Sequence, residues 1–293
     1  MKIAIYGKTI PENYVKSIQH LIDFLENKKC KIHIYKPFEL LLQKKIKFKS
    51  DYTIFTGFSD INREIDFLIS IGGDGTLLNS ITLIKDTGIP ILGVNTGRLG
   101  FLSSISIEEI DMALDLVFKK KYRLEKRSLI ELISDNQPFG DLNYALNELT
   151  IVKKETTSLI TINTYVNEEF LNSYWADGII IATPTGSTAY SLSCGGPIIS
   201  PESENFLITP ISSHNLTVRP FVIPDKHQIK LKVTEDRNKK FLISLDSRTY
   251  TMDCAAEIIV KKASFKINLI RLENENFFST LRNKLMWGLD KRN

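Results

Sequence analysis

The sequence has few of the residues that build disulfide frameworks, metal centres or membrane spans. Its three cysteines, Cys30, Cys194 and Cys254, are odd in number and far apart in the 293-residue chain, which indicates a reducing compartment rather than a disulfide scaffold. The four histidines show no ligand spacing with them, which speaks against a zinc site. No apolar run is long enough to cross a bilayer, and the chain opens on a short strand-like segment instead of a signal peptide. We therefore expect a cytoplasmic protein with no membrane partner.

Charge of one sign is not in excess either. The net charge is +4, and the lysine clusters at residues 44–49 and 119–121 fall at expected ends of elements, where they would form solvated faces. No nucleic-acid module or aromatic-studded basic stripe accompanies them, so we expect no nucleic-acid partner. Two standard phosphate-binding fingerprints are also missing, Gly-x-Gly-x-x-Gly after the first strand and Gly-x-x-x-x-Gly-Lys-Ser/Thr.

The hydrophobic content, 43%, is that of a globular protein with one large domain or two ordinary ones. Over the first 95 residues strand-like and helix-like stretches alternate, which predicts a parallel, Rossmann-like sheet. The expected strands are 2–6, 31–35, 67–71 and 91–94, and 15–25 carry a helical stripe. Ser106 and Glu109 have the spacing of a capping box at the start of a helix that continues through Val117. We expect that helix to end the first domain near residue 120.

From Tyr122 onward the chain consists of short strand-like runs separated by turns. The expected strands are 129–133, 145–153, 160–166, 178–182, 229–234, 241–245 and 257–261, with turns at 135–138, 167–168 and 236–238. Such spacing predicts a β-sandwich or an open barrel. The fold class is therefore α/β plus all-β: a Rossmann-like amino-terminal domain of residues 1–120 and a β-rich domain of residues 121–270. A last helix over 274–287 is expected to pack back on the first domain, which residues from about 271 to 293 complete.

The segment Gly72-Gly73-Asp74-Gly75-Thr76 joins a buried strand to a helix. Glycines let a ligand approach the main chain closely, and a helix amino terminus attracts anions. In parallel sheets such a turn is a usual place for a ligand. Asp74 would repel a phosphate unless it takes a proton, orients a hydroxyl or meets a cation, so the turn suggests phosphoryl transfer. The alternative is that Asp74 only caps the helix.

Two further features could serve a nucleotide, and each has a plainer alternative. Phe101, in a glycine-bearing loop after the next strand, offers a flat surface to a base, although a place in the core would suit it equally. Asn147 and Glu148 interrupt an apolar strand; they could lie on an exposed face, but we favour hydrogen bonds to a ribose.

Residues 183–197 are rich in small hydroxyl residues and end in Gly-Gly-Pro. They follow an apolar strand, and Tyr190 adds a stacking face that carries a hydroxyl. Such a segment presents amides and hydroxyls to a polar ligand without bulk in the way. Hydroxyl residues are denser here than an ordinary turn requires, so the sequence predicts a binding loop.

Together, the Gly72–Thr76 turn, Asn147-Glu148 and the Thr183–Tyr190 motif closely resemble the NAD kinases, over nearly the whole chain. The turn alone is shared with diacylglycerol and sphingosine kinases and, more distantly, with phosphofructokinases; the hydroxyl-rich motif decides between them. The resemblance implies transfer of the terminal phosphoryl group of ATP to the 2′-hydroxyl of the adenosine ribose of NAD, giving NADP. It also implies Mg²⁺ or another divalent cation and a homodimer or homotetramer. A lipid kinase and a non-catalytic dinucleotide sensor are the alternatives.

The resemblance also implies roles for single residues. Asp74 would accept the proton of the ribose hydroxyl, and the donor phosphates would lie at Gly72, Gly73, Gly75 and Thr76. The implied NAD contacts are Asp74, Gly75, Phe101, Asn147, Glu148, Trp175, Asp177, Thr185, Thr188, Ala189, Tyr190, Ser193 and Ser212. No protein side chain is assigned to the metal. Two departures from the family pattern are Trp175, where many relatives have a basic or small residue, and Asp246-Ser247, which replaces an Asp-Gly pair and leaves the role of Asp246 open.

Overall fold

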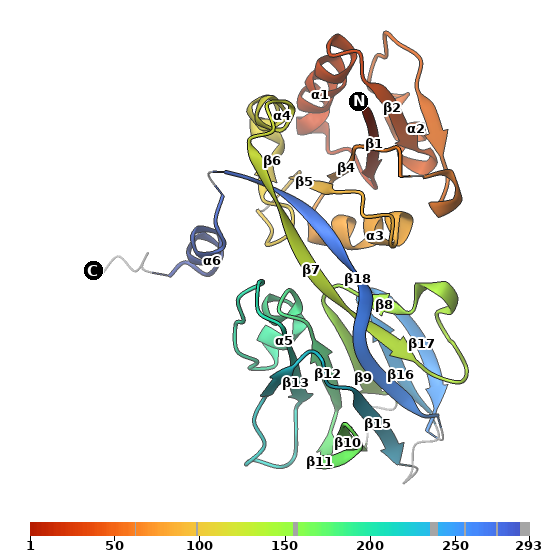
Figure 1. Cartoon of the computed structure of the whole chain (residues 1–293), viewed down its shortest axis with the longest axis vertical. Coiled ribbons are helices and arrows are strands. Elements are labelled where there is room, and N and C mark those ends of the chain that lie inside the picture. The colour runs from red at the N-terminus through yellow and green to blue at the C-terminus, as the bar shows by residue number, and fades with distance from the viewer. Residues whose placement is uncertain are drawn as a thin grey trace. The chain divides into compact units, whose positions relative to one another are not determined.

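The computed structural model describes residues 1–61, 63–97, 99–154, 158–234, 240–254, 256–273 and 275–287. It divides the chain into two compact units (Figure 1). The first comprises Met1–Lys126 with Ile267–Asn293, and the second Arg127–Lys266. Both boundaries fall inside strands, β7 (Tyr122–Ile133) and β18 (Ile258–Leu272), rather than in linkers. Among the described residues, no helix is long and apolar enough to span a membrane.

The first unit is built on the predicted parallel sheet. Its strands follow the order β3-β2-β1-β4-β5, and β5 also pairs with β6 and, through Ile91, with Leu269 of β18. The bounds are β1 Lys2–Gly7, β2 Lys31–Tyr35, β3 Thr53–Phe55, β4 Phe67–Ile71, β5 Ile91–Asn95 and β6 Ile105–Ser106. Of these, β3 and β6 were not predicted, because two or three residues carry no readable period.

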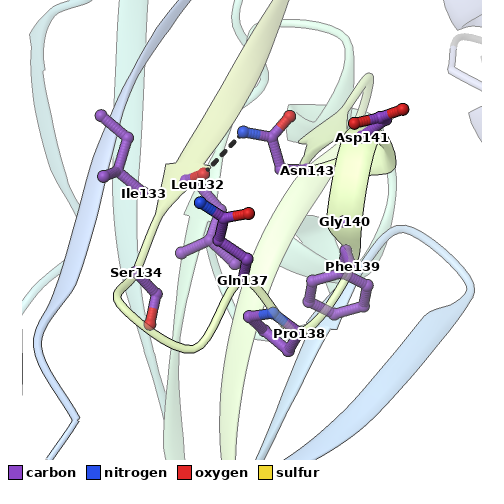
Figure 2. A pocket seen from close by; sticks show the side chains of 9 residues that line it. All are labelled: Leu132, Ile133, Ser134, Gln137, Pro138, Phe139, Gly140, Asp141 and Asn143. Atoms are coloured by element: carbon purple, nitrogen blue, oxygen red, sulfur yellow. Dashed lines mark hydrogen bonds between the residues drawn. The ribbon is translucent and has the colours of Figure 1, made fainter.

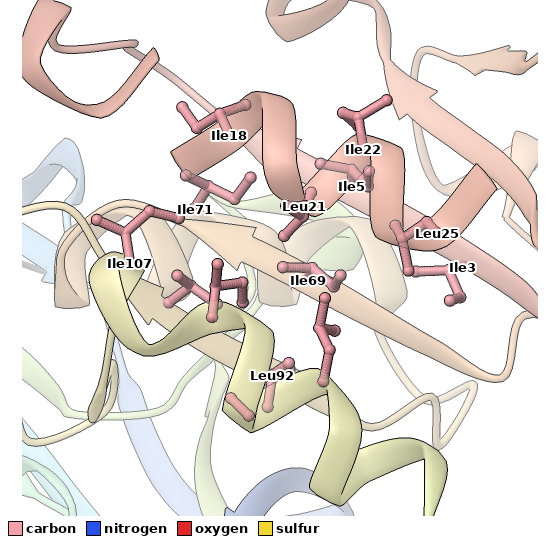
Figure 3. Packing of buried hydrophobic residues seen from close by; sticks show 14 of the residues in the cluster. Ile3, Ile5, Ile18, Leu21, Ile22, Leu25, Ile69, Ile71, Leu92 and Ile107 are labelled. Atoms are coloured by element: carbon pink, nitrogen blue, oxygen red, sulfur yellow. The ribbon is translucent and has the colours of Figure 1, made fainter. Parts of the chain in front are cut away.

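Helices cover the sheet of the first unit on its two faces. The helices α1 (Val15–Asn27) and α4 (Ile110–Phe118) share a core with alternate residues of the central strands (Figure 3). The helix α3 (Asp74–Ile84) packs against the other face, where a Cβ on Gly93 would stand 2.8 Å from Leu77 Cδ1. Short helical segments complete the unit: α2 (Lys36–Leu42) and the 3-10 turns Glu12–Tyr14, Phe58–Asp60 and Ile107–Glu109.

Two predicted helix ends differ from the structure. The capping box at Ser106 does not form, because its hydroxyl bonds to the Glu108 carboxylate and a 3-10 turn precedes α4. The last helix, α6 (Phe277–Leu285), starts later than predicted, and the side chain of Asn276 caps it by accepting the Ser279 N–H at 2.8 Å. The predicted start, residue 274, lies outside the described residues. As predicted, α6 belongs to the first unit.

The second unit is an antiparallel β-sandwich, as predicted. One sheet has the order β14-β13-β12-β9-β16-β17; the other contains β11-β10-β15-β18 and β7, which also pairs with β8. The bounds are β8 Tyr144–Ala145, β9 Glu148–Lys153, β10 Ile160–Val166, β11 Glu169–Ala176, β12 Gly178–Ala182, β13 Asn205–Ile211, β14 Phe221–Pro224, β15 Ile229–Thr234, β16 Lys240–Leu245 and β17 Arg248–Asp253; short helical segments are Gly140–Leu142, Gly186–Thr188 and α5 (Tyr190–Ser193). Side chains of both sheets meet in one core.

Two details of this unit bear on the site. The single strand predicted over residues 145–153 is broken at Leu146 and Asn147, between β8 and β9. Strand β12 is apolar throughout because it is buried on both faces: Ile179 and Ile181 face the sandwich core, and Ile180 and Ala182 face a smaller cluster. The turn predicted at 236–238 lies outside the described residues.

Candidate functional site

The glycine turn of the first unit leads from β4 into α3, as predicted. Gly72 has φ 144°, and a Cβ there would stand 2.4 Å from Thr76 Oγ1, so the position requires glycine. Its N–H donates to Val94 O at 2.8 Å, which corrects the prediction that this amide faces a donor phosphate. The N–H groups of Gly73, Asp74 and Gly75 have no protein acceptor within the described part of the chain. This exposed helix start is where an anion would bind.

Asp74 does not cap α3, whose N-cap is Gly73. Its carboxylate instead accepts three consecutive N–H groups from the segment Gly100–Ser104, which we call the Asp74 loop. Phe101 N–H donates to Oδ2 at 2.8 Å, and the N–H groups of Leu102 and Ser103 donate to Oδ1 at 3.1 and 2.9 Å. The helix-cap alternative is therefore wrong, and the carboxylate has a fixed orientation.

The opposite side of the Asp74 loop is bound by Arg271, which the sequence analysis did not predict. This arginine is 6% exposed and donates to the carbonyls of Phe101 and Leu102. A lone charge in the apolar run Ile267–Leu272 was the available signal. The ring of Phe101 is half-buried, with Lys284 Nζ 5.8 Å from its centroid, so it is not a core residue. Arg98, beside this loop, lies outside the described residues.

In the second unit, the hydroxyl-rich loop folds onto the Asn147-Glu148 segment. Thr183 donates from Oγ1 to Leu146 O at 2.6 Å and from its N–H to Asn147 O at 2.9 Å. Gly186 lies so close to Asn147 O that a Cβ would stand 2.1 Å from it. The structure thus brings together the two motifs that lie about 40 residues apart in the sequence.

The members of that loop differ in exposure. Thr185 is buried and accepts a hydrogen bond from Arg127 Nη1 at 3.2 Å, and Ser187, which was not predicted, is buried against Ile199. Thr188 and Ala189 are half-buried, while Tyr190 and Ser193 are exposed. Of these residues, Thr188, Ala189, Tyr190 and Ser193 are therefore accessible, whereas Ser191 between them is buried.

Asp246, whose role the sequence left open, holds the Asn147-Glu148 segment in place. It lies in the two-residue turn between β16 and β17, with φ 51°. Its carboxylate accepts the N–H groups of Leu146, Asn147 and Glu148 at 2.9, 2.8 and 3.3 Å. Asn147 and Glu148 are each 9% exposed, so the exposed-face alternative for them is wrong.

Charged and polar groups gather around Glu148. Burial, and next the charge of Asp246, raise the pKa of Glu148 to about 8. Burial also raises the pKa of Asp246, against the lowering effect of its three amide hydrogen bonds. Partial desolvation of the hydroxyl of the exposed Tyr190, and next the charges of Cys194 and Asp177, raise the pKa of Tyr190. At neutral pH this cluster therefore includes a protonated carboxyl that can donate a hydrogen bond.

Trp175, Asp177 and Ser212 lie near one another through the ends of β11 and β13. Asp177 donates its N–H to Ile211 O at 3.0 Å, beside Ser212, and pairs with Lys153 Nζ at 2.5 Å. The Trp175 ring is 45% exposed and lies 4.2 Å from the ring of His214. The ends of these two strands therefore carry an accessible aromatic side chain and an ion-paired carboxylate.

A cavity of 360 Å³ in the second unit lies apart from these residues. It is formed by the turn of the β7–β8 hairpin, where Asn143 Nδ2 donates to Leu132 O at 3.0 Å (Figure 2). None of the predicted site residues lines it. Among the described residues there is also no cluster of three or more His, Cys, Asp or Glu side chains that could hold a metal ion.

A parallel sheet that carries a glycine turn with exposed amides, beside a carboxylate of fixed orientation, has the arrangement expected of a nucleotide-dependent phosphotransferase. Family models match both parts of the chain: the ATP-NAD kinase N-terminal domain over residues 3–122 and the C-terminal domain over residues 146–272. The NAD kinase of Cytophaga hutchinsonii is 49% identical over 294 residues, and that of Bacteroides fragilis 42% over 294, each covering 100% of both chains. The chain therefore belongs to the ATP-NAD kinase family of phosphotransferases.

Two solved structures share the fold. Yeast NADH kinase in complex with NADH superimposes with a TM-score of 0.86 at 23% identity, covering 98% of this chain and 88% of that chain. An NAD kinase from Archaeoglobus fulgidus in complex with ATP gives 0.76 at 24% identity, covering 98% and 99%.

Proposed function

We propose that this protein transfers the terminal phosphoryl group of ATP to the 2′-hydroxyl of the adenosine ribose of NAD, giving NADP and ADP. Membership of the ATP-NAD kinase family supports NAD and ATP as the two substrates. The observation that carries the finer reaction is the orientation of Asp74, whose carboxylate is held by three amides beside the exposed start of α3. A carboxylate has about four acceptor positions. Three are used here, which leaves one for a substrate hydroxyl.

In this reaction the ribose 2′-oxygen attacks the terminal phosphorus of ATP, the bond from that phosphorus to the bridging oxygen breaks, and ADP leaves with the bond's electrons. Asp74 receives the hydroxyl proton. Catalysis then consists mainly of alignment and charge stabilisation. The amides of Gly73 and Gly75 and the hydroxyl of Thr76 would hold the donor phosphates. The amide of Gly72 would not take part, because it donates to Val94 O. Since the carboxylate of Asp74 is already bound by amides, Mg²⁺ would be held by the phosphates of ATP rather than by protein side chains, and there it would offset their charge.

The second unit would bind the dinucleotide. Asn147 and Glu148 would hydrogen-bond the adenosine side, and Glu148, protonated at neutral pH, would act as a donor. Thr188, Ala189 and Tyr190 would contact the adenine and its ribose. Asp177, Trp175 and Ser212 would lie at the nicotinamide end, with Ser193 as a further polar contact. Thr185 would act by supporting the loop, because it is buried and bonded to Arg127.

Replacing Asp74 by asparagine tests the proposal. The parent protein, given NAD, ATP and Mg²⁺, is expected to form NADP, measured with an NADP-specific dehydrogenase. Asp74→Asn keeps the shape and removes the base, so kcat should fall by about a hundred- to ten-thousand-fold. The Kd for NAD, measured by calorimetry, should change little.

The matched control is Asp86→Asn, an exposed aspartate beyond the far end of α3. The kcat of this variant for NADP formation should equal that of the parent. If Asp74→Asn works within a few-fold of the parent, Asp74 is not the proton acceptor. A parent that binds NAD without forming NADP would be a sensor, and one that ignores NAD but phosphorylates diacylglycerol would be a lipid kinase.

A further inference from the structure

The Asp74 loop is bound by opposite charges on its two sides. Its N–H groups point to the Asp74 carboxylate, and its carbonyls point to the Arg271 guanidinium. Phe101 O accepts from Nη2 at 2.9 Å, and Leu102 O accepts from Nη1 at 2.9 Å. Ser104 Oγ accepts from Nη1 at 2.5 Å. Two successive peptide groups therefore join the arginine to the carboxylate.

These two peptide groups are polarised in the same sense. The group between Phe101 and Leu102 receives Arg271 at its oxygen and gives its hydrogen to Asp74, and so does the group between Leu102 and Ser103. Hydrogen bonds linked in this way strengthen one another, and those with a charged partner are stronger than neutral ones. The position of the carboxylate is thus tied to that of the guanidinium.

Arg271 is in turn held by Glu125. Its Nε lies 3.7 Å from Glu125 Oε2, and the two side chains are 7% and 13% exposed. A buried guanidinium needs both a counter-charge and hydrogen-bond acceptors. The planar fork of arginine meets all of these partners at once, which a lysine cannot do.

We propose that Arg271, held by Glu125, is a positioning residue for catalysis: it fixes the Asp74 loop and through it the direction of the Asp74 carboxylate. The inference rests on the proposed function, in which that carboxylate receives the ribose proton. Because a displacement of about 1 Å in a catalytic group can cost about a hundredfold in rate, Arg271 would control kcat although it touches neither substrate.

The test is a set of variants compared for kcat, for the KM of NAD and for thermal unfolding. Arg271→Lys keeps a cation but not the fork, and kcat is expected to fall by about a hundredfold with the KM for NAD changed less than threefold. Glu125→Gln leaves Arg271 its carbonyl partners, and a loss on the order of tenfold is expected. Arg219→Lys is the matched control: this exposed arginine of the second unit also donates to two main-chain carbonyls, those of Leu216 and Val218, but contacts neither Glu125 nor the Asp74 loop, and kcat should stay at the parent value.

A double variant separates positioning from general destabilisation. In the Asp74→Asn background, Arg271→Lys should lower the residual rate less than twofold, because the group on which it acts is already gone. If Arg271 were only structural, its replacement by lysine would lower kcat by the same factor in the parent and in the Asp74→Asn background. That result, or an Arg271→Lys protein with the parent kcat, overturns the inference.

A crystal structure of Arg271→Lys gives a readout that does not depend on turnover. We expect at least one of the three N–H bonds to Asp74 to be lost; three intact bonds would contradict the inference. If the parent forms no NADP, the proposed function fails, and this structure alone decides whether Arg271 positions Asp74.

Discussion

At Gly100 the space that a side chain would need is taken by the Asp74 carboxylate. A Cβ there would stand 1.9 Å from Oδ1, so that either the carboxylate or the loop has to move. Gly100→Ala should therefore turn the carboxylate or displace the Asp74 loop, and lower kcat for NADP formation by about a hundredfold.

Gly57→Ala is the control for this substitution, because a Cβ at Gly57 meets nothing within 4 Å. It should retain the parent rate. Thermal unfolding of both variants distinguishes a misplaced carboxylate from an unfolded chain, and a Gly100→Ala enzyme within threefold of the parent would contradict the geometry.

The second prediction at this scale concerns Glu148. Its pKa of about 8 in the folded protein is above the ordinary value of 4.5, so between these values the folded state holds a proton that the unfolded state has lost. The free energy of unfolding should therefore fall as the pH rises from 4.5 to 8, with a limiting slope of about 1.4 kcal/mol per pH unit from this group. In Glu148→Gln that contribution disappears and the slope flattens.

Urea unfolding at several pH values measures this slope. Glu202→Gln, at an exposed glutamate, is the control and should leave it unchanged. Equal slopes in the parent and in Glu148→Gln would mean that Glu148 ionises normally in the folded protein.

Residue types in the sequence predicted several of these positions, but not what holds them. A lone carboxylate among glycines marked Asp74, and a polar pair in an apolar strand marked Asn147 and Glu148. The groups that orient them come from far along the chain: Asp74 bonds to amides 27 to 29 residues away, and Asp246 to amides 98 to 100 residues away. No local period or spacing encodes such pairs.

At the scale of elements, the two predicted helix starts should respond differently to loss of the capping residue. Asn276 caps α6, so Asn276→Ala should destabilise that helix by about 1 kcal/mol. Ser106 makes no cap bond, so Ser106→Ala should change stability by less than about 0.5 kcal/mol. Amide hydrogen exchange in the first turn of each helix measures both, and an equal effect at Ser106 would show that its capping box does form.

Elements with a strong local pattern were predicted best. The predicted first and last residues are the same as in the structure for β2, β4, β10, β12 and β15. Each of these strands is an apolar or alternating run between turns. The strand predicted over 145–153 is interrupted at Leu146 and Asn147, because the N–H groups of these residues donate to the Asp246 carboxylate instead of to a neighbouring strand. The long β18 was predicted only in part, since its charged and polar residues hide the alternation.

At the scale of the whole molecule, both boundaries between the units lie in strands. Trypsin can cut after Lys126, Arg127 and Lys266, but their backbones are part of β7 and β18. Proteolysis requires local unfolding, so these bonds should be cut late. The exposed turn at Lys28 and Lys29, where Lys29 has φ 56°, should be cut earlier.

Mass spectrometry of a time course under native conditions tests this order, with the urea-unfolded chain as the control in which all sites are cut. Early fragments ending at Lys126 or Lys266 would show that the strands open there. The division into an α/β part and a β part was readable from the order of strand-like and helix-like stretches. The return of the chain to the first unit at Ile267 was not, because it depends on pairing between Leu269 and Ile91, which are 178 positions apart.

Within the described residues, an aspartate in each unit accepts three neighbouring main-chain amides: Asp74 in the first and Asp246 in the second. In both, the carboxylate satisfies three amide donors that would otherwise need another acceptor. The entropy of ordering these loops is therefore lost when the polypeptide folds, and little of it has to be lost again when a nucleotide arrives. Affinity in such a protein reflects mostly the ligand's own contacts, and selectivity follows from a shape that exists beforehand.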